Sequence, residues 1–255
     1  MTPPGARLAG TRLVVVRHGE ATCNAEDYIG GHGSCRGLTQ RGRAQVAALG
    51  RRLRRTGELQ KPAAVWTSVL PRARQTGAAV AEALGVEVAG ARCDLCERHP
   101  GEADGLTWAA YEARYARTSL PSGAGDDLPL APGGESWSGF VERAAGALED
   151  LAVAHAGRLV VAVAHGGVVD ASLIAFLGLP VRADGIRFHA EHTSLTEWRH
   201  TGACWQLVRY SDAAHLAGAD ELQVPHPAWL TGDAEPGSVS PLPDAAPPGG
   251  GAQQA

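Results

Sequence analysis

An apolar run that ends in a charged turn constrains this chain more than any other feature. Leu13–Val16 supplies four β-prone residues, and Arg17-His18-Gly19-Glu20 follows directly. Such a run is typical of a strand buried on both faces of a parallel sheet. Open parallel sheets bind ligands outside the carboxyl ends of their strands. We therefore predict a central strand at 12–17 with His18 facing a crevice, although the stretch alone fits a surface histidine equally well.

Length and composition favour one α/β domain. The 255 residues are 44% hydrophobic, which is enough for one sizeable core. The formal net charge is -4 and the isoelectric point is about 6.2, so neither nucleic acid nor an anionic membrane is an expected partner. Lys61 is the only lysine. Recognition of phosphate or carboxylate would therefore depend on arginine.

Five scattered cysteines favour a reducing, cytoplasmic environment, because an odd number makes a poor disulfide framework. Cys93 and Cys96 have the spacing of a zinc or redox pair. A four-thiolate zinc site needs a second such pair, and a redox pair needs its own βαβ context. We therefore expect no metal ion and no cofactor. No apolar run approaches the length of a membrane-spanning helix.

The spacing of apolar residues predicts strands that alternate with helices. The predicted strands are 12–17, 63–67, 86–88, 158–164, 193–199 and 204–210. The predicted helices follow Thr39, begin near 70 and near 107, follow Ser136, and begin directly after Gly167. This order predicts a three-layer α/β/α sandwich with a mostly parallel central sheet. Residues 1–10 are predicted to be a lead-in, 11–218 the catalytic domain, and the Pro/Gly-rich residues 219–255 a disordered tail.

Three cationic or histidine signatures fall at the carboxyl ends of predicted strands. They are Arg17-His18, Arg72 and His165. The ends of parallel strands share one crevice, so these residues are expected to converge. Ser68 is expected to cap the helix that carries Arg72, close to a helix N-terminus that favours anions. Two arginines and two histidines describe a site for a dianion such as phosphate.

Transfer of a bound phosphoryl group needs a nucleophile, cationic groups that stabilise the developing charge, and an acid that protonates the leaving group. His18, held by its turn, is the better candidate for the nucleophile, and His165 would hold phosphoryl oxygens. Arginine can neutralise the charge without a metal ion. The acid is expected in the loop that follows residue 96. Glu97, Glu102 and Asp104 all qualify, and composition does not choose among them.

Six ordered motifs together resemble the histidine phosphatase superfamily, which includes the cofactor-dependent phosphoglycerate mutases and related phosphatases. The motifs are Arg17-His18-Gly19-Glu20 with Asn24, Gly37-Leu38-Thr39 with Gly42, Ser68-x-Leu70-x-Arg72-Ala73-x-Gln75-Thr76, Glu97 ahead of Gly101 and Asp104-Gly105, Gly134-Glu135-Ser136, and Ala164-His165-Gly166-Gly167. The resemblance covers residues 11–216 in the family's order.

The resemblance implies a metal-independent phosphatase of the phosphoglycerate mutase-like fold. In this family's mechanism His18 would become phosphorylated, and Glu97 would protonate the leaving group and then activate water. Arg17, Arg72 and His165 would bind the phosphoryl group. Asn24 and Gly166 would add phosphate contacts. The expected partner is a small phosphorylated molecule, and a homodimer is compatible with the sequence.

Several positions depart from the family pattern. Residues 31–37 lack the expected Asp, and His192 stands where an Asn often precedes Thr193. Pro100 replaces an aromatic residue of mutases, and the Asn that mutases usually carry soon after Gly105-Leu106 is missing. These departures leave the substrate open and favour a phosphatase over a mutase. Specificity is expected from residues 100–135, the predicted lid.

Other hypotheses and residues carry less weight. A phosphate-binding scaffold without turnover keeps the same pocket, and a metallohydrolase would need a metal-binding motif that is missing. His99 and four further histidines are predicted to be surface or capping groups, the four being His155, His189, His200 and His215. The cations Arg51, Arg52, Arg54 and Arg55 are predicted to form a solvated helix face.

Overall fold

The structure is a computed structural model that describes residues 10–115, 128–181 and 188–217. Its strands are β1 (Thr11–Arg17), β2 (Ala64–Ser68), β3 (Val88–Arg92), β4 (Leu159–Ala164), β5 (Leu195–His200) and β6 (Trp205–Asp212). Its α-helices are α1 (Thr22–Ala25), α2 (Gln40–Thr56), α3 (Pro71–Leu84), α4 (Trp108–Tyr115), α5 (Trp137–Ala154) and α6 (Gly166–Phe176). Residues 1–9 of the predicted lead-in, 116–127 of the predicted lid and the predicted tail 219–255 lie outside the described residues.

Strand β1 lies inside the sheet, as its apolar run predicts. The strand order is β3-β2-β4-β1-β5-β6. β1 is parallel to β4, and β2 is parallel to both β4 and β3, whereas β5 and β6 are antiparallel to their neighbours. The register places Arg17 opposite Ala164. The residues that follow β1 and β4 therefore leave the sheet side by side.

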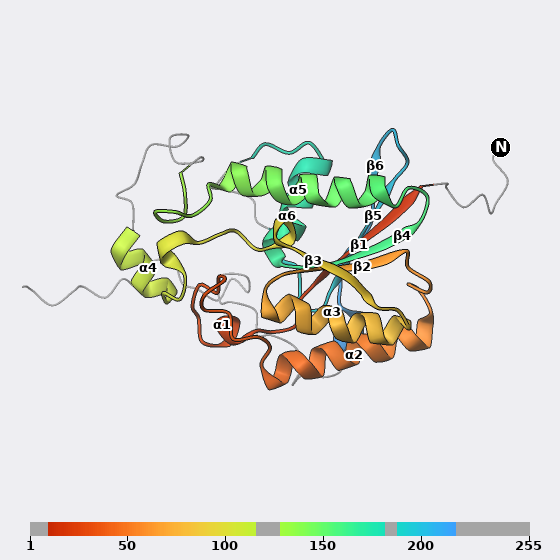
Figure 1. The fold of residues 1–255 in the computed structure, drawn as a ribbon, viewed down its shortest axis with the longest axis horizontal. Coiled ribbons are helices and arrows are strands. Elements are labelled where there is room, and N and C mark those ends of the chain that lie inside the picture. The colour runs from red at the N-terminus through yellow and green to blue at the C-terminus, as the bar shows by residue number, and fades with distance from the viewer. Residues whose placement is uncertain (1–9, 116–127, 182–187, 218–255) are drawn as a thin grey trace, which may run out of the picture. The chain divides into compact units, whose positions relative to one another are not determined.

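Successive residues of β1 face two different apolar cores, because side chains alternate along a strand. Val14 and Val16 pack in the core beneath α2 and α3, and Leu13 and Val15 pack in the core beneath α5 and α6. Figure 1 shows these two helix pairs on opposite sides of the strands. The predicted three-layer sandwich with a mostly parallel sheet is confirmed.

Two helices begin where their capping residues predict. The side chain of Thr39 accepts a hydrogen bond from Gly42 N at the start of α2, and Ser136 accepts one from Gly139 N at the start of α5. The third prediction, that Ser68 caps α3, is wrong. Leu70 is the N-cap of α3, whereas Ser68 is the last residue of β2, and its hydroxyl accepts from Leu70 N at 3.2 Å and contacts His165 Nε2.

Two smaller differences also separate the structure from the predicted elements. The short helix α1 lies between β1 and α2, where the spacing of apolar residues predicts no helix. β3 begins at Val88 rather than at residue 86, because the chain first turns at Gly85, whose φ of 68° ends α3 in the left-handed region. Neither difference moves a residue of the predicted crevice.

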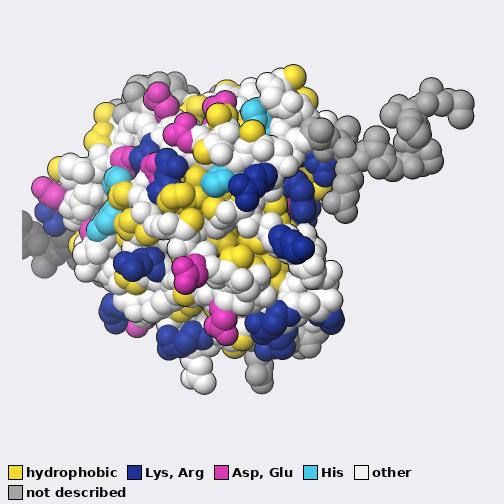
Figure 2. All heavy atoms as spheres, turned by 45° about the vertical axis from the view of Figure 1, so that its right-hand side comes forward, with side chains coloured by type: hydrophobic (Ala, Val, Ile, Leu, Met, Phe, Trp, Pro, Cys, Tyr) yellow, Lys and Arg dark blue, Asp and Glu magenta, His cyan; other side chains and the backbone are white. Residues whose placement is uncertain are grey.

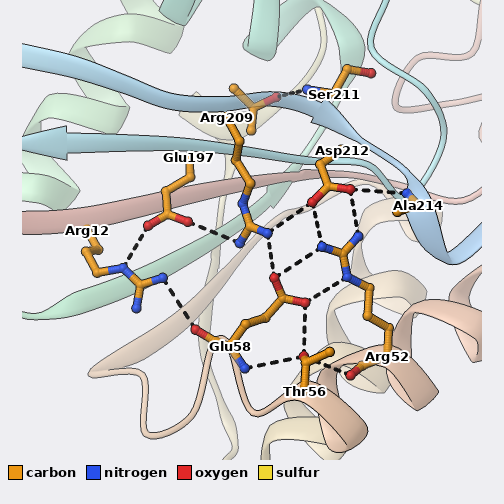
Figure 3. A network of polar contacts seen from close by, with 10 residues as sticks. Arg12, Arg52, Thr56, Glu58, Glu197, Arg209, Ser211, Asp212 and Ala214 are labelled. Atoms are coloured by element: carbon orange, nitrogen blue, oxygen red, sulfur yellow. Dashed lines mark hydrogen bonds and ion pairs between the residues drawn. The ribbon is translucent and has the colours of Figure 1, made fainter.

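Three arginines and three carboxylates form an ion network that joins α2 to β1, β5 and β6 (Figure 3). The members of this Arg52 network are Arg12, Arg52, Glu58, Glu197, Arg209 and Asp212. Arg52 donates to Glu58 at 2.7 Å and to Asp212 at 2.8 and 2.5 Å. The prediction of a solvated helix face is therefore wrong for Arg52, because its carboxylate partners come from distant segments.

Charge on the surface is mixed in sign. On the face drawn in Figure 2, arginine side chains are spread out, with acidic side chains between them. Within the described residues, no helix is long and apolar enough to cross a membrane.

Candidate active site

The strand ends bring His18, Arg72 and His165 together. His18 follows β1, His165 follows β4, and the two rings lie 5.1 Å apart between centroids. Arg72, in the first turn of α3, reaches between them. Its Nε is 3.1 Å from His18 Nε2 and 3.3 Å from His165 Nδ1. All three side chains are buried, so one guanidinium N–H is shared between two imidazole acceptors.

The turn after β1 fixes the proton of His18. Its Nδ1 lies 2.6 Å from the carbonyl oxygen of Gly19. A carbonyl oxygen only accepts hydrogen bonds, so Nδ1 carries the proton of the neutral ring and Nε2 keeps its lone pair. Burial, with Arg72 and Arg17 nearby, holds the pKa of His18 well below its usual value. The lone pair on Nε2 is therefore available at neutral pH.

His165 has the opposite tautomer. Its Nε2 lies 2.8 Å from Ser68 Oγ, and its Nδ1 accepts from Arg72, so the neutral ring donates to Ser68. Burial, followed by the nearby charge of Arg72, lowers the pKa of His165 well below its usual value. A bound dianion would favour the imidazolium, whose second N–H would then point at the anion.

Arg17 lies beside His192 and keeps one donor unused. Its Nη1 donates to Ala190 O, and its Nη2 lies 3.1 Å from His192 Nε2. Among the described residues its buried Nε has no hydrogen-bond partner, so this N–H could donate to a bound anion. Asn24 lies at the exposed rim, where its Oδ1 is 3.3 Å from His192 Nε2.

A strained residue holds His192 in this position. Thr193 has a φ of 60°, in the left-handed region that β-branched residues rarely adopt. Its backbone N–H donates to Arg17 O at 3.0 Å, and its hydroxyl contacts His215 Nε2 at 2.8 Å. These hydrogen bonds therefore hold Thr193 in an unfavourable backbone conformation. Such strained residues are common at functional sites.

Glu97 is the one carboxylate of the three candidates that lies at the pocket. Its Oε2 accepts from Gly167 N at 3.1 Å, at the N-terminus of α6 next to His165. A Cβ at Gly167 would lie 2.1 Å from Glu97 Oε1, so only glycine allows this approach. Glu102 is exposed against Tyr115. Asp104 accepts from the backbone N–H groups of Gly31 and Gly33 at 2.8 and 2.7 Å.

The charge of this pocket is uncompensated at short range. Within the described part of the chain, neither Arg17 nor Arg72 makes an ion pair, and the groups in contact with Arg72 Nε are two neutral rings. Burial lowers the pKa of Arg17, and Glu97, Glu191 and Asp170 oppose this from a greater distance. Buried cations without a partner are costly, so the charges of this pocket favour an anionic ligand.

Sequence reasoning did not foresee two of the residues in contact here. It did not assign the Ser68 hydroxyl to His165, because that contact depends on the order β2-β4 in the sheet. It noted His192 only as a departure from the family pattern, and the structure places it against Arg17, with its ring 5.8 Å from that of His18. The only sequence signal was a histidine at a position where the family often has Asn.

Comparison with known proteins agrees with this geometry. The family model for the histidine phosphatase superfamily (branch 1) matches residues 13–213. The chain is 31% identical over 227 residues to the metal-independent phosphoserine phosphatase of Arabidopsis thaliana, covering 89% of this chain and 90% of that protein. It is 33% identical over 178 residues to the glucosyl-3-phosphoglycerate phosphatase of Mycolicibacterium vanbaalenii, covering 67% of this chain and 76% of that protein.

Solved structures show the same fold. A mycobacterial glucosyl-3-phosphoglycerate phosphatase, in complex with VO3, superposes with a TM-score of 0.61 at 27% identity, covering 78% of this chain and 97% of that one. The family match over residues 13–213 includes the strand ends that carry His18 and His165. The chain therefore belongs to the histidine phosphatase superfamily, branch 1, and is a phosphoric monoester hydrolase.

Proposed function

We propose that this protein hydrolyses a small phosphomonoester through a phosphohistidine formed on His18 Nε2. The observation that carries the proposal is the hydrogen bond from His18 Nδ1 to Gly19 O, which leaves Nε2 unprotonated beside Arg72. The Nε2 lone pair attacks phosphorus, and the bond from phosphorus to the leaving oxygen breaks. Protonated Glu97 gives its proton to that oxygen.

Water completes the cycle in the second step. A water molecule attacks the phosphohistidine, gives a proton to the Glu97 carboxylate and breaks the bond between phosphorus and Nε2. Inorganic phosphate leaves, and Glu97 is again protonated. Gly167 N holds the Glu97 carboxyl at the same place in both steps.

The arginines stabilise the charge on the transferring group. The unused Nε of Arg17, the Nε of Arg72 and protonated Nδ1 of His165 would each donate to a phosphoryl oxygen. Phosphoryl transfer depends chiefly on such positioning and charge neutralisation. Asn24 and the backbone of Gly166 are expected to complete the phosphate contacts. No metal ion is assigned to this step.

The names of two relatives support a small-molecule substrate. These relatives are named for phosphoserine and for glucosyl-3-phosphoglycerate, which are both small phosphomonoesters. The decisive experiment incubates the enzyme with a radiolabelled small phosphomonoester and quenches it in alkali, where phosphohistidine survives. Label bound to the wild type and missing from His18→Ala supports the proposal.

His200→Ala is the matched control, because His200 pairs with Thr11 at the opposite end of β1. It is expected to keep full label and full phosphate release. Full phosphate release by His18→Ala would disprove the mechanism. Phosphate binding without turnover of any ester in a panel of sugar phosphates, nucleotides, phosphoglycerates and phosphoserine would instead support a scaffold.

A phosphoglycerate mutase is the second candidate, and one observation bears on it. Arg98, which follows the proposed acid in the sequence, donates to the carbonyl oxygens of Glu135 and Leu128, which belong to the loop before α5. We expect phosphate release from 3-phosphoglycerate without conversion to 2-phosphoglycerate. Bisphosphate-dependent conversion would favour the mutase.

A further inference from the structure

Two cysteines and two histidines gather beside the active site in a group that the phosphoryl chemistry does not use. Cys93 and Cys96 flank the short 3-10 helix η1 (Cys93–Leu95), His99 follows three residues later, and His32 comes from the loop after α1. One nitrogen or sulfur atom from each lies within 4.8 Å of the others. We call this group the Cys-His cluster.

Three sulfur-to-nitrogen distances in the Cys-His cluster match those between the ligands of a tetrahedral zinc ion. His32 Nε2 lies 3.3 Å from Cys93 Sγ and 3.8 Å from Cys96 Sγ, and His99 Nε2 lies 3.6 Å from Cys93 Sγ. Zinc with tetrahedral ligands, at about 2.3 Å from sulfur and 2.0–2.1 Å from nitrogen, separates a sulfur from a nitrogen by about 3.5 Å. The three distances scatter around that value.

The groups behind the cluster hold its ligands in the required orientation. His99 presents Nε2 to the cysteines, and its Nδ1 faces Glu135 Oε2 at 3.6 Å, which is the carboxylate–histidine arrangement found behind metal-bound imidazoles. Arg143 binds the same Glu135 and donates to the carbonyl oxygens of Cys93 and Cys96 at 3.3 and 3.2 Å. The turn that carries both sulfurs is therefore fixed.

The loop that supplies His32 is fixed as well. Asp104 accepts hydrogen bonds from Gly31 N and Gly33 N, on either side of His32. Arg72 donates to Gly30 O at 2.9 Å. His32 lies within residues 31–37, which depart from the family pattern, and the phosphoryl chemistry gives the cluster no role.

We propose that the Cys-His cluster binds one structural zinc ion through the sulfurs of Cys93 and Cys96 and the Nε2 atoms of His32 and His99. Both thiols lose their protons to solvent on binding, and both imidazoles stay neutral, so the two thiolates balance the charge of Zn²⁺. Four protein ligands close the site, as in structural rather than catalytic zinc centres. The expectation of no metal ion considered a second cysteine pair and overlooked histidines as partners.

The zinc ion would connect the loop that carries His32 to the segment that carries Cys93, Cys96 and His99, on the side of the pocket where the leaving group is expected. Glu97 lies between Cys96 and His99, so two ligands bracket the proposed acid. Cys96 Sγ also lies 3.2 Å from Ser68 Oγ. A thiolate can only accept here, so Ser68 would donate to Cys96 while accepting from His165 Nε2. Zinc would thus orient the hydroxyl that fixes the tautomer of His165.

Metal analysis of the full-length, tag-free protein tests the proposal. The protein is expressed with added zinc, purified without chelator and analysed for all transition metals. About one zinc per chain is expected. Cys93→Ser and His32→Ala should fall to background, because each removes one ligand. Cys93 and His32 are both exposed, so these variants should fold, and circular dichroism checks this.

Cys204→Ser is the matched control, since Cys204 is an exposed free cysteine in the β5–β6 hairpin and should keep its zinc. Cobalt added to metal-free protein should give the sulfur-to-cobalt charge-transfer band and the visible bands of a tetrahedral site, and Cys93→Ser should weaken both. Wild type without zinc and without the cobalt spectrum would overturn the proposal. Zinc retained by both Cys93→Ser and His32→Ala, or iron or copper in its place, would also overturn it.

Discussion

Two clusters of arginine in this molecule differ in what balances their charge. In the Arg52 network, three arginines face three carboxylates at 2.5 to 3.2 Å (Figure 3). In the pocket, Arg17 and Arg72 contact neutral imidazoles and backbone carbonyls instead. Each arginine of the network is paired with carboxylates in the folded chain, whereas the two pocket arginines make no ion pair among the described residues.

The comparison teaches that the same residue type can serve stability or function. An ion network satisfied within the protein loses stability when one partner is removed. A cluster of unpaired buried cations lowers the stability of the free protein, and binding of an anionic substrate should offset this loss. Variants in the two regions should therefore have opposite patterns of activity and stability.

The largest expected effect is on turnover in the pocket. His18→Ala removes the atom that accepts the phosphoryl group, so kcat should fall by about 10⁵-fold or more. The free energy of unfolding should stay near that of the wild type, since the substitution also removes a buried ring beside two cations. Phosphate-release assays and chemical denaturation measure the two quantities. A loss of activity that only mirrors unfolding would contradict the comparison.

The second largest effect is expected at Arg72, which is proposed to stabilise the charge of the phosphoryl group. Arg72→Gln keeps a polar side chain but removes the charge between the two histidines, so kcat/KM should fall by about 10³-fold or more. Inorganic phosphate should raise the Tm of the wild type, because it binds the folded state alone, and should no longer do so for the variant. An unchanged response to phosphate would show that Arg72 does not face the anion.

The two regions should also lose stability in different pH ranges. Burial lowers the pKa values of His18, His165 and His192 in the folded protein. The unfolded chain therefore binds more protons than the folded chain below about pH 6.5. As the pH is lowered, the free energy of unfolding decreases by up to about 1.4 kcal/mol per pH unit for each histidine. Phosphate should reduce this loss by favouring protonated His165.

Denaturant titrations at pH 7.5, 6.5 and 5.5, with phosphate or with chloride at equal ionic strength, test this prediction. The carboxylates of the Arg52 network should contribute little in this range, whereas His215 should add to the loss, because burial and then Arg52 lower its pKa to about 4. Arg52 lowers the pKa of Asp212 through a direct hydrogen bond, so that contribution is lost only as the pH falls below the ordinary carboxyl pKa of about 4. Stability that is flat down to pH 5.5, or equal in both salts, would count against the unpaired pocket.

The smallest expected effect is in the network. Arg52→Met leaves Glu58 and Asp212 with fewer partners, and both are largely buried. The free energy of unfolding should fall by about 1 to 3 kcal/mol, less than for a fully buried pair, while kcat at a permissive temperature is unchanged. Arg51→Met, at an exposed position of the same helix, is the control and should change neither quantity.

The sequence predicted the layers and most of the pocket because those depend on local patterns. A continuous apolar run located β1, and the rule that parallel strands bind ligands at their carboxyl ends brought His18 and His165 together. Glu97 was different. Three carboxyls fitted the loop equally well, and only the resemblance to a family selected Glu97 before the structure placed it against Gly167.

Contacts between distant segments could not be predicted in this way. His165 and Ser68 are 97 residues apart, and Arg52 and Asp212 are 160 apart. Their meeting depends on strand order and on the path of loops, which residue spacing does not encode. The same reason explains why His32, 61 residues from Cys93, was not recognised as its neighbour.

The register of β1 against β4 has a consequence for how this enzyme tolerates insertions. Arg17 lies opposite Ala164, and side chains alternate between the faces of a strand. One extra codon within β1 would exchange the apolar residues between the two cores or turn His18 to the opposite face. A gene carrying that insertion would encode every catalytic residue and still produce an inactive protein.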